Sequence, residues 1–333
     1  MILFALLQLA FPCGGLLFGE DVQVTSKTQQ VILSLKGDNT VVEYQIQYNG
    51  DAEDFGWIIP IFGEMVEIQE GDVSRFEQYD EYTRPNTIYE YASSSGCVWH
   101  DKSSGEPELE SPFSEPFVQG FTGQFEYLII PASQGEDFIS WGQDNGWSTE
   151  EVSSILPQYG SESNISLVLV KIRQDLLEEE ISTSPTIKIE YERHEMRYPA
   201  MLSKISSASE LHTVIYVEGD GQAQVGGWGE QIVGDIEGSI NDDAQSLYLQ
   251  RLREISETRT SFGIVFSGEI DGVWVTRFDS LLRPEQNTHE PFFRIGQKRE
   301  PFGTYVFLIQ TSGAWMFGIF WGVSVFIRGR RKR

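Results

Sequence analysis

Residues 42–48 read VEYQIQY, an unbroken alternation of apolar and polar side chains. Successive side chains of a β-strand point to opposite faces, so this period of two predicts a strand with one face on a core and one in water. We expect residues 30–35 to pair with it through a turn at 37–39, and Asn49-Gly50 to form a second turn. Working outward, residues 55–62 predict a more fully apolar strand.

Helical signals occur in four places. A spacing of three between apolar residues predicts a helix over 73–82, and another is expected over 242–256. Between them, capping-box spacing predicts helices that start at Ser133 and Ser148, and the second should stop at Pro157.

The remaining pattern favours strands in runs with helices clustered between them. Further strands are expected at 125–131, 165–172, 186–191, 212–217, 264–266 and 273–278. Residues 219–240 hold seven glycines and predict a long mobile loop. The fold class is therefore α+β with mostly antiparallel sheet, rather than a doubly wound fold. Residues 101–116 are polar and Pro-rich, which predicts a connection between a β-rich lobe at 11–110 and an α+β lobe at 111–300.

The charge balance limits the possible partners. The chain of 333 residues has 24 Lys and Arg against 50 Asp and Glu, a net charge of −26. Such an acidic chain is not expected to bind nucleic acid through phosphate contacts. Clustered carboxylates at 51–54 and 242–243 lack the 12-residue calcium-loop spacing, so we interpret them as a solvated acidic surface with at most weak divalent cation binding.

The two ends of the chain suggest a membrane protein. Residues 304–327 carry no charge, and a helix of 24 residues is about 36 Å long, enough to cross a bilayer. The tail 328–333 has five basic residues, which predicts that it lies in the cytoplasm and that the acidic body lies outside. Without that tail, 19 basic and 50 acidic residues give −31 for residues 1–327. Residues 1–10 are apolar and fit a signal peptide, with a buried first strand as the alternative.

The only two cysteines are Cys13 and Cys97. Outside the cytoplasm, such a pair is most simply a disulfide. Two alternatives stay open: a catalytic dyad of Cys97 with His100, and lipidation of Cys13. Two cysteines are too few for a disulfide-dense scaffold or a four-thiolate zinc site.

Other motifs give no strong chemical signal. The four histidines, at 100, 194, 212 and 289, show no zinc-protease spacing, and Gly226-Gly227-Trp228-Gly229 lacks the spacing of a phosphate-binding loop. Trp57 and Trp141 lie on predicted core faces. We therefore expect no metal and no cofactor.

Several segments, taken in order, resemble the bacterial family known as domain of unknown function 2330. They are Pro12-Cys13-Gly14-Gly15, the strand 44–60 with its pattern QYNGDAEDFGWIIP, the strand and helices of 125–157, the strand pair within 185–199, and the segment 275–293. The resemblance covers roughly residues 12–295. It implies an extracytoplasmic setting and a C-terminal anchor, and no activity. Many members have further cysteines after the Cys-Gly-Gly motif, whereas this chain has Leu16-Leu17-Phe18, which implies one bridge at most.

These patterns favour one function class and leave a second open. The first is a non-catalytic binding or scaffolding module of the cell envelope, held in the cell membrane by one C-terminal helix. The second is an extracytoplasmic hydrolase whose site uses carboxylates distant in sequence or the Cys97–His100 pair. A cleft lined by two close carboxylates would favour the hydrolase.

Overall fold

The computed structural model describes most of the chain between residues 15 and 309. The described residues are 15–18, 25–49, 55–90, 118–144, 147, 149–160, 164–173, 183–193, 195–203, 210–257 and 259–309. Cys13, Cys97, His100, His194, Asp51, Glu53 and Asp54 lie outside them, as do residues 1–14 and 310–333. The disulfide, the alternative dyad, the signal peptide and the basic tail therefore stay predictions.

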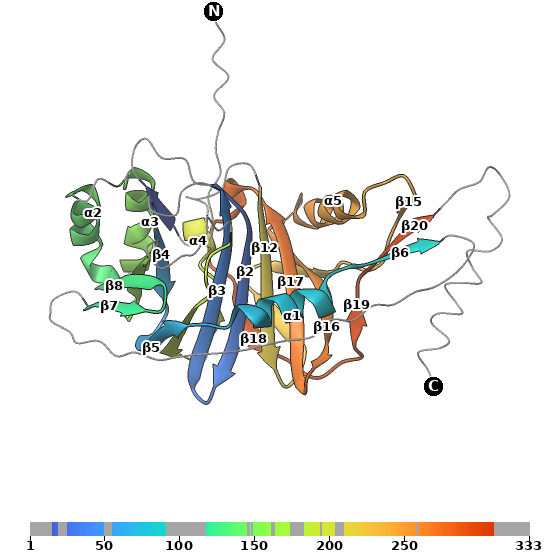
Figure 1. The fold of residues 1–333 in the computed structure, drawn as a ribbon, viewed down its shortest axis with the longest axis horizontal. Helices are drawn as coiled ribbons and strands as arrows, with labels where there is room; N and C mark the ends of the chain where they lie inside the picture. The colour runs from blue at the N-terminus through green and yellow to red at the C-terminus, as the bar shows by residue number, and fades with distance from the viewer. Residues whose placement is uncertain are drawn as a thin grey trace, which may run out of the picture.

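Two large sheets and two small ones make up the described fold (Figure 1). The nine-stranded sheet contains β2 (Thr25–Lys36), β3 (Asn39–Asn49), β5 (Glu64–Glu70), β10 (Ile187–Glu192), β12 (Leu211–Gly219), β14 (Gly229–Ile232), β16 (Ser261–Ile270), β17 (Val273–Leu282) and β19 (Phe302–Gly303). The five-stranded sheet contains β1 (Gly15–Phe18), β4 (Phe55–Ile61), β7 (Val118–Thr122), β8 (Phe125–Pro131) and β9 (Ser166–Ile172). The small sheets contain β11 (Met196–Arg197), β13 (Ala223–Gly226) and β18 (Phe292–Ile295), and β6 (Asn86–Glu90), β15 (Ile236–Ser239) and β20 (Tyr305–Ile309).

Five helices accompany the sheets in the described part of the chain. They are α1 (Val73–Thr83), α2 (Gly135–Asp144), α3 (Glu150–Gly160), α4 (Ala200–Ser203) and α5 (Ala244–Glu257). Strand pairing among the described residues is antiparallel except for β2 with β12, β14 with β16, and β20 with both β15 and β6. The fold is thus mostly β, with mixed sheets and few helices, which confirms the predicted predominance of sheet over helix.

The main core lies between the two large sheets. Trp57 on β4 and Tyr44 on β3 are both buried there, with ring centroids 5.6 Å apart in an edge-to-face contact. Phe278 and Phe293 continue this core toward β18, at 5.2 Å. Burial of these aromatic side chains removes the largest apolar surfaces from water and so holds the layers together. The prediction that Trp57 lies in the core is confirmed, while the Trp141 side chain lies outside the described residues.

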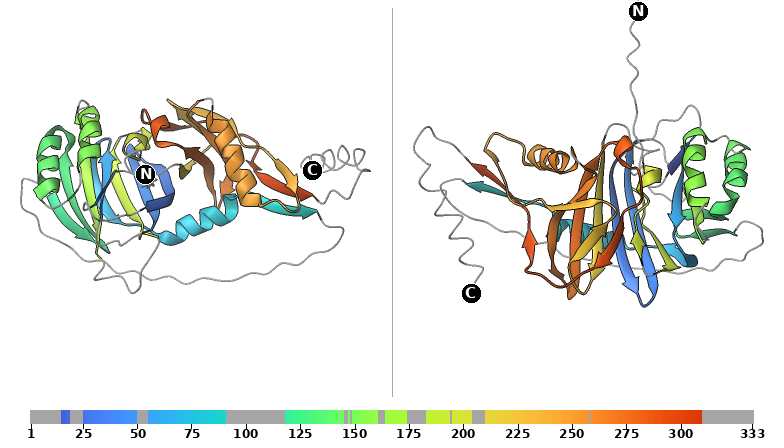
Figure 2. Two further views of the ribbon diagram at one scale, coloured as in Figure 1. Left: turned by 90° about the horizontal axis from the view of Figure 1, so that it is seen from above. Right: turned by 180° about the vertical axis from the view of Figure 1, so that it is seen from behind.

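The other face of the nine-stranded sheet is covered by α1 and α5. Phe76 and Tyr79 of α1 pack on Tyr216 and Val275, while Leu252 of α5 belongs to a separate apolar cluster. Viewed from above, α1 crosses the sheet obliquely, and α2 and α3 lie at the opposite end of the molecule from β6 and β20 (Figure 2). α1 therefore joins the edge strand β5 to β6 across the sheet.

The structure corrects the prediction for residues 42–48. The strand forms, and its hairpin with β2 has the expected turn, with Lys36 opposite Asn39. However, Glu43 and Gln45 are buried as well as their apolar neighbours, so both faces are covered. The alternation correctly predicts which side chains share a face of the strand. It does not predict that the polar face is exposed to water, because α1 covers that face.

Two further predictions are wrong in part. The helix expected to stop at Pro157 continues to Gly160, because Leu156 and Tyr159 are both buried and their packing holds the last turn. The glycine-rich segment 219–240 is not one long loop, since β13, β14 and β15 lie within it. At Gly226 a Cβ would lie 2.1 Å from the ring of Phe292, so glycine there allows close strand pairing.

The first residues of the predicted membrane helix, 304–327, are not helical in the structure. Residues 305–309 form β20, which pairs with β6 and β15, and Thr304 donates a hydrogen bond to the Val265 carbonyl at 3.1 Å. Among the described residues no helix is long and apolar enough to cross a membrane. Strand pairing also crosses the lobe boundary predicted near residue 110: β12 and β10 join β2 and β3, and β9 joins β4.

Candidate functional site

Helix α1 brings the most notable charged side chains of the described fold to one face of the nine-stranded sheet. The helix starts at Asp72, whose carboxylate accepts a hydrogen bond from the Ser74 N–H at 2.9 Å. It ends before Pro85, which cannot continue a helix. Between these ends, Phe76, Tyr79 and Thr83 are buried. The charged residues Arg75 and Asp80 therefore lie at the edges of an apolar contact.

Arg75 binds two carboxylates at once. One guanidinium nitrogen donates to Glu43 on β3 and another donates to Glu218 on β12. Tyr79, one turn further along α1, donates its hydroxyl to Glu218 as well. The structure thus brings together two carboxylates from strands that are distant in the sequence, with the guanidinium between them.

Glu43 is the more deeply buried of these two acids. Its side chain is only 2% exposed. Burial raises the pKa of Glu43, and the nearby Arg75 lowers it only in part. Its second oxygen, Oε2, is buried without a hydrogen-bond partner. The charged form of Glu43 therefore depends on Arg75.

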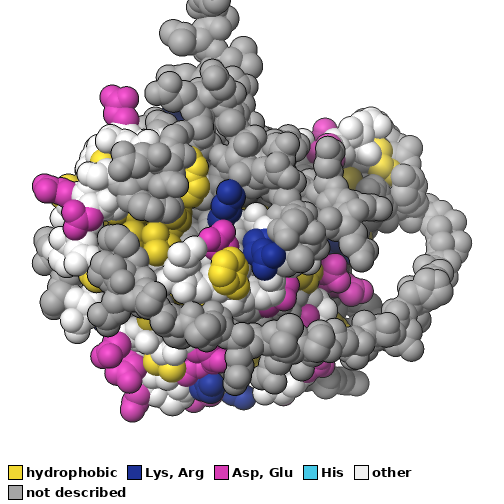
Figure 3. All heavy atoms as spheres, turned by 60° about the vertical axis from the view of Figure 1, so that its left-hand side comes forward, with side chains coloured by type: hydrophobic (Ala, Val, Ile, Leu, Met, Phe, Trp, Pro, Cys, Tyr) yellow, Lys and Arg dark blue, Asp and Glu magenta, His cyan; other side chains and the backbone are white. Residues whose placement is uncertain are grey.

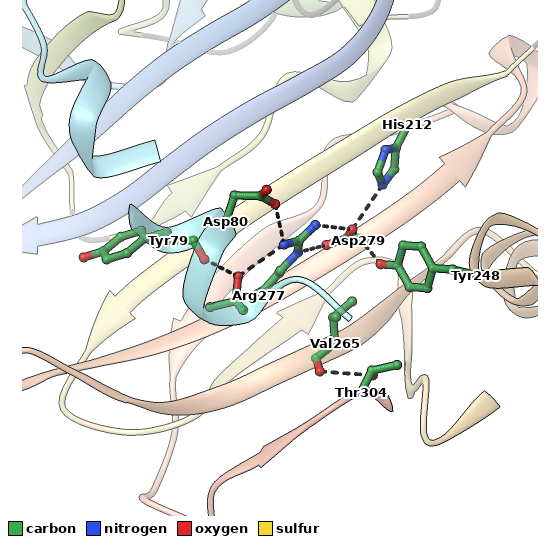
Figure 4. A network of polar contacts seen from close by, with 9 residues as sticks. Tyr79, Asp80, His212, Tyr248, Val265, Arg277, Asp279 and Thr304 are labelled. Carbon is green, nitrogen blue, oxygen red and sulfur yellow. Dashed lines mark hydrogen bonds and ion pairs between the residues drawn. The ribbon is translucent and has the colours of Figure 1, made fainter. Parts of the chain in front are cut away.

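A second charged network lies under the other end of α1 (Figure 4). Arg277 on β17 donates from Nε and Nη2 to the carboxylate of Asp279, at 2.7 and 3.0 Å. Its Nη1 donates to Asp80 of α1 at 2.9 Å and to Thr83 at 3.2 Å. The Arg277 guanidinium also lies 5.6 Å from the ring centroid of Tyr216. The buried side chain of Arg277 therefore has a partner on each side.

Asp279 connects this network to α5. The Tyr248 hydroxyl of α5 donates to its Oδ2 at 2.6 Å, and His212 Nε2 lies 3.1 Å from the same oxygen. Burial alone would raise the pKa of Asp279, but Arg277 and the hydrogen bond from His212 hold it well below its usual range. The Asp279–Arg277 pair is thus charged, hydrogen bonded through every nitrogen of the guanidinium, and enclosed between α1 and α5.

A third acid, the half-buried Glu290, lies on the opposite side of the sheet. Glu290 accepts hydrogen bonds from the Tyr159 hydroxyl of α3 and from the Met201 N–H of α4, the latter at 3.2 Å. Burial raises the pKa of Glu290 to about 8, despite the opposing effect of these donors and of Arg197. Glu290 therefore links α3 to α4 mainly as a neutral acid at neutral pH.

The chemistry available to these groups is restricted by their partners. Glu43 and Glu218 are a close carboxylate pair of the kind expected for a hydrolase, but Arg75 binds both. The His212 ring contacts Asp279, yet in the described ranges it makes no hydrogen bond to a serine, threonine or cysteine. The observed geometry is therefore one in which charges hold helices on a sheet.

The structure places the remaining predicted residues in structural roles. Asp242 accepts a hydrogen bond from the Ser239 N–H at 2.6 Å, and Asp243 accepts one from the Ser246 N–H at 2.8 Å. His289 Nε2 lies 3.0 Å from the Gly227 carbonyl oxygen. Within the ranges that the structure describes, no group of three or more His, Cys, Asp or Glu is arranged to hold a metal ion.

The glycine motif is also not a simple flexible loop. Trp228 is buried, stacks on Phe262 with centroids 5.0 Å apart, and donates its indole N–H to the His289 carbonyl at 3.0 Å.

Sequence reasoning missed the charged networks beneath α1 and α5. One signal for them is the strand VWVTRFDSLL at 273–282, in which Arg277 and Asp279 are the only charged residues of an almost wholly buried strand and lie at a spacing of two. Charged side chains on one face of a buried strand need partners, and here they partner each other. Glu43 gives a weaker signal, because an alternating strand allows its side chain to face water.

On the face of the molecule shown in Figure 3, the visible acidic side chains are spread out. Figure 3 shows the end of the molecule with α2, α3 and the five-stranded sheet, where Asp and Glu side chains are distributed around the visible face. They do not gather into one patch in that view. This distribution matches a generally solvated acidic surface.

The fold and its buried charges define a mostly β protein of mixed sheets whose covering helices are held by ion pairs. The chain belongs to the family of uncharacterised proteins conserved in bacteria known as domain of unknown function 2330, whose model matches residues 8–221. The match ends after β12, although β17 pairs with β12 and continues the same sheet. The described fold therefore extends beyond the matched segment.

Comparison with curated proteins finds no match. Among solved structures, the chain is similar to baculovirus P35 at 10% identity and a TM-score of 0.36, over 84% of this chain and 93% of that one. It is also similar to a mutated baculovirus P35 after caspase cleavage, solved at 2.7 Å, at 10% identity and a TM-score of 0.34, over 81% of this chain and 94% of that one.

Proposed function

We propose that this protein is a membrane-anchored, extracytoplasmic binding or scaffolding module of the cell envelope and that it is not catalytic. The observation that carries the proposal is the junction after β20. The last described strand ends at Ile309, and the next residue, Gln310, begins an uncharged stretch that runs to Ile327 and is followed by the basic tail.

The corrected span remains long enough for a membrane helix. A helix over 310–327 would be about 27 Å long against a hydrocarbon core of about 30 Å. This length is close to the lower limit for a span, so the helix has to start at or directly after Gln310. The five basic residues that follow favour a cytoplasmic location for the tail.

The buried charges support a non-catalytic role. Arg75 binds the close carboxylates Glu43 and Glu218 and joins α1 to two strands of the sheet. Arg277 and Asp279 likewise form an ion pair with each other, and Asp279 also accepts a hydrogen bond from Tyr248 of α5. Each network uses its hydrogen-bonding groups to position an element rather than to face a substrate.

A hydrolase is the second candidate, because Glu43 has a raised pKa and lies close to Glu218. An acid beside a carboxylate is the arrangement used in glycoside hydrolysis. In this fold, however, a substrate would have to displace Arg75. The two functions predict different effects of a substitution at Glu43.

Glu43→Gln should destabilise the protein by about 1.5–3 kcal/mol, because it weakens a charge-assisted hydrogen bond at a buried site. Chemical denaturation measures the loss, and Glu64→Gln on the exposed part of β5 is the matched control. A neutral or stabilising effect of Glu43→Gln would favour the hydrolase, since functional acids are often held at a cost in stability.

Truncation tests the anchor. A chain ending at Ile309 should leave the membrane fraction and stay folded, because β20 is kept. A chain ending at Gly303 should be released but unstable, because it loses the buried Val306 and Leu308. In the full chain, a fluorescent reporter that matures only in the cytoplasm should be active when fused after Arg333. A silent reporter, or a truncation at Ile309 that remains in the membrane, would contradict the anchor.

A further inference from the structure

We propose that the end of the molecule formed by β15, β20 and β6 faces the phospholipid headgroups around the protein's own anchor, and that the end formed by α2 and α3 is presented away from the membrane. This orientation rests on the anchoring part of the proposed function. It follows from strand direction and from the short distance between the last strand and the span.

All three strands end at the same level. β20 is the central strand and runs parallel to both neighbours, with Ile309 opposite Ser239 of β15 and Glu90 of β6. The chain therefore leaves β20 and β6 at one end of the molecule, and the turn after β15 lies there too. In Figure 1 this end projects beyond α5, at the opposite extreme of the long axis from α2 and α3.

β20 is fixed to the body up to its last residue. Val306 and Leu308 are buried, and the Ile240 N–H donates to the Ile309 carbonyl at 3.0 Å. Strand pairing on both edges prevents this last part of the body from acting as a long tether. Ile309 therefore moves with the body.

The span leaves almost no linker. If the three polar residues Gln310, Thr311 and Ser312 were fully extended, they would cover at most about 11 Å. The stretch from Gln310 to Ile327 is already near the minimum length for crossing, so little of it is available as spacer. The end of the body that carries Ile309 is thus held within about 11 Å of the membrane surface.

The chemistry of this end suits contact with headgroups and not insertion. Asn241, Asp242 and Asp243 are exposed in the turn that follows β15. The large exposed apolar side chains of the described residues are Val66, Val73, Tyr82, Phe121, Ile232 and Val273, and none of these lies in β15, β20 or the turn. The body as a whole is strongly acidic, with 19 basic and 50 acidic residues in 1–327, so it should be repelled by anionic lipids, which opposes a flat arrangement of the body on the membrane.

The test measures the depth of three labels on the full chain in phosphatidylcholine vesicles that carry a headgroup quencher. An azide-bearing residue replaces Asn241 near β15, Asp38 in the β2–β3 turn, or Ser140 on α2, and is coupled to a fluorophore without altering the cysteines. These positions are exposed. We expect strong quenching at 241, weaker quenching at 38 and almost none at 140. The labelled chain ending at Ile309 is the control and should show no quenching.

The outcomes separate the two proposals. Vesicle flotation reports the anchor independently of the labels. A chain that floats with quenching at 140 equal to or greater than that at 241 would overturn the orientation and leave the anchor standing. A full chain that does not float would overturn the anchor and the orientation with it.

Discussion

Replacement of Asp279 by asparagine should destabilise the folded protein by about 3–5 kcal/mol, because it leaves the buried guanidinium of Arg277 without its charged partner. The Asp279 side chain is 0% exposed and that of Arg277 is 4% exposed, so water cannot replace the lost interaction. The same carboxylate accepts a hydrogen bond from Tyr248 and contacts His212, so α5 also loses support. Chemical denaturation and the thermal midpoint measure the effect.

Asp80→Asn is the matched control, because Asp80 binds the same guanidinium but its side chain is 37% exposed. We expect that substitution to cost at most about 1 kcal/mol. The double variant Arg277→Met with Asp279→Leu should recover much of the stability lost in Asp279→Asn, since replacing both charges leaves no buried unpaired ion and Asp80 is exposed to water. A loss below about 1 kcal/mol in Asp279→Asn would contradict the structural role of this pair.

Stability should fall as the pH rises from about 4.5 to about 8, through the titration of Glu290. The carboxyl of the unfolded chain titrates near its ordinary pKa of 4.5, whereas burial raises the pKa in the folded protein to about 8. Between these values the folded state binds more protons than the unfolded state, so raising the pH disfavours folding. The contribution is fully present below pH 4.5 and is lost as the pH rises through about 8, with a size on the order of a few kcal/mol.

Glu290→Gln isolates this effect, because glutamine keeps the size of the side chain and does not titrate. The difference in unfolding free energy between the wild-type protein and Glu290→Gln should shift in favour of the variant as the pH rises from 5 to 8. Tyr159→Phe removes the hydroxyl that donates to Glu290 and should raise the folded pKa further. A difference that stays constant over this pH range would show that Glu290 is ionised in the folded protein.

The local sequence patterns predicted the helices and strands better than they predicted what packs against each of them. The alternation at 42–48, the helix at 73–82 and the hairpin between β2 and β3 follow from local preferences and are present in the structure. The residues that cover these elements come from distant parts of the chain. Glu43 faces Arg75 from a helix later in the chain, and no property of the strand itself reveals that partner.

The two largest mistakes have physical causes of the same kind. Residues 219–240 are rich in glycine, which usually signals a loop, but their strands obtain partners in β16, β18 and β20. Residues 304–309 are as apolar as a membrane span, but an apolar strand inside a core has the same composition. The charged networks beneath α1 depend on side chains from several separate elements, so only the assembled sheet could identify them.

The parallel pairing of β2 with β12 imposes an order on folding. β2 and β3 are adjacent in the sequence and can form their hairpin early. The other edge of β2 pairs with β12, a strand far along the chain. Thr28 is opposite His212, and β3 to β11 lie between them in the sequence. Contacts of such range slow folding, since the loop between them must first be closed. Until β12 arrives, the early hairpin presents an unpaired apolar edge that can associate with other chains. A nascent chain of this protein should therefore need a holding chaperone until β12 has emerged from the ribosome.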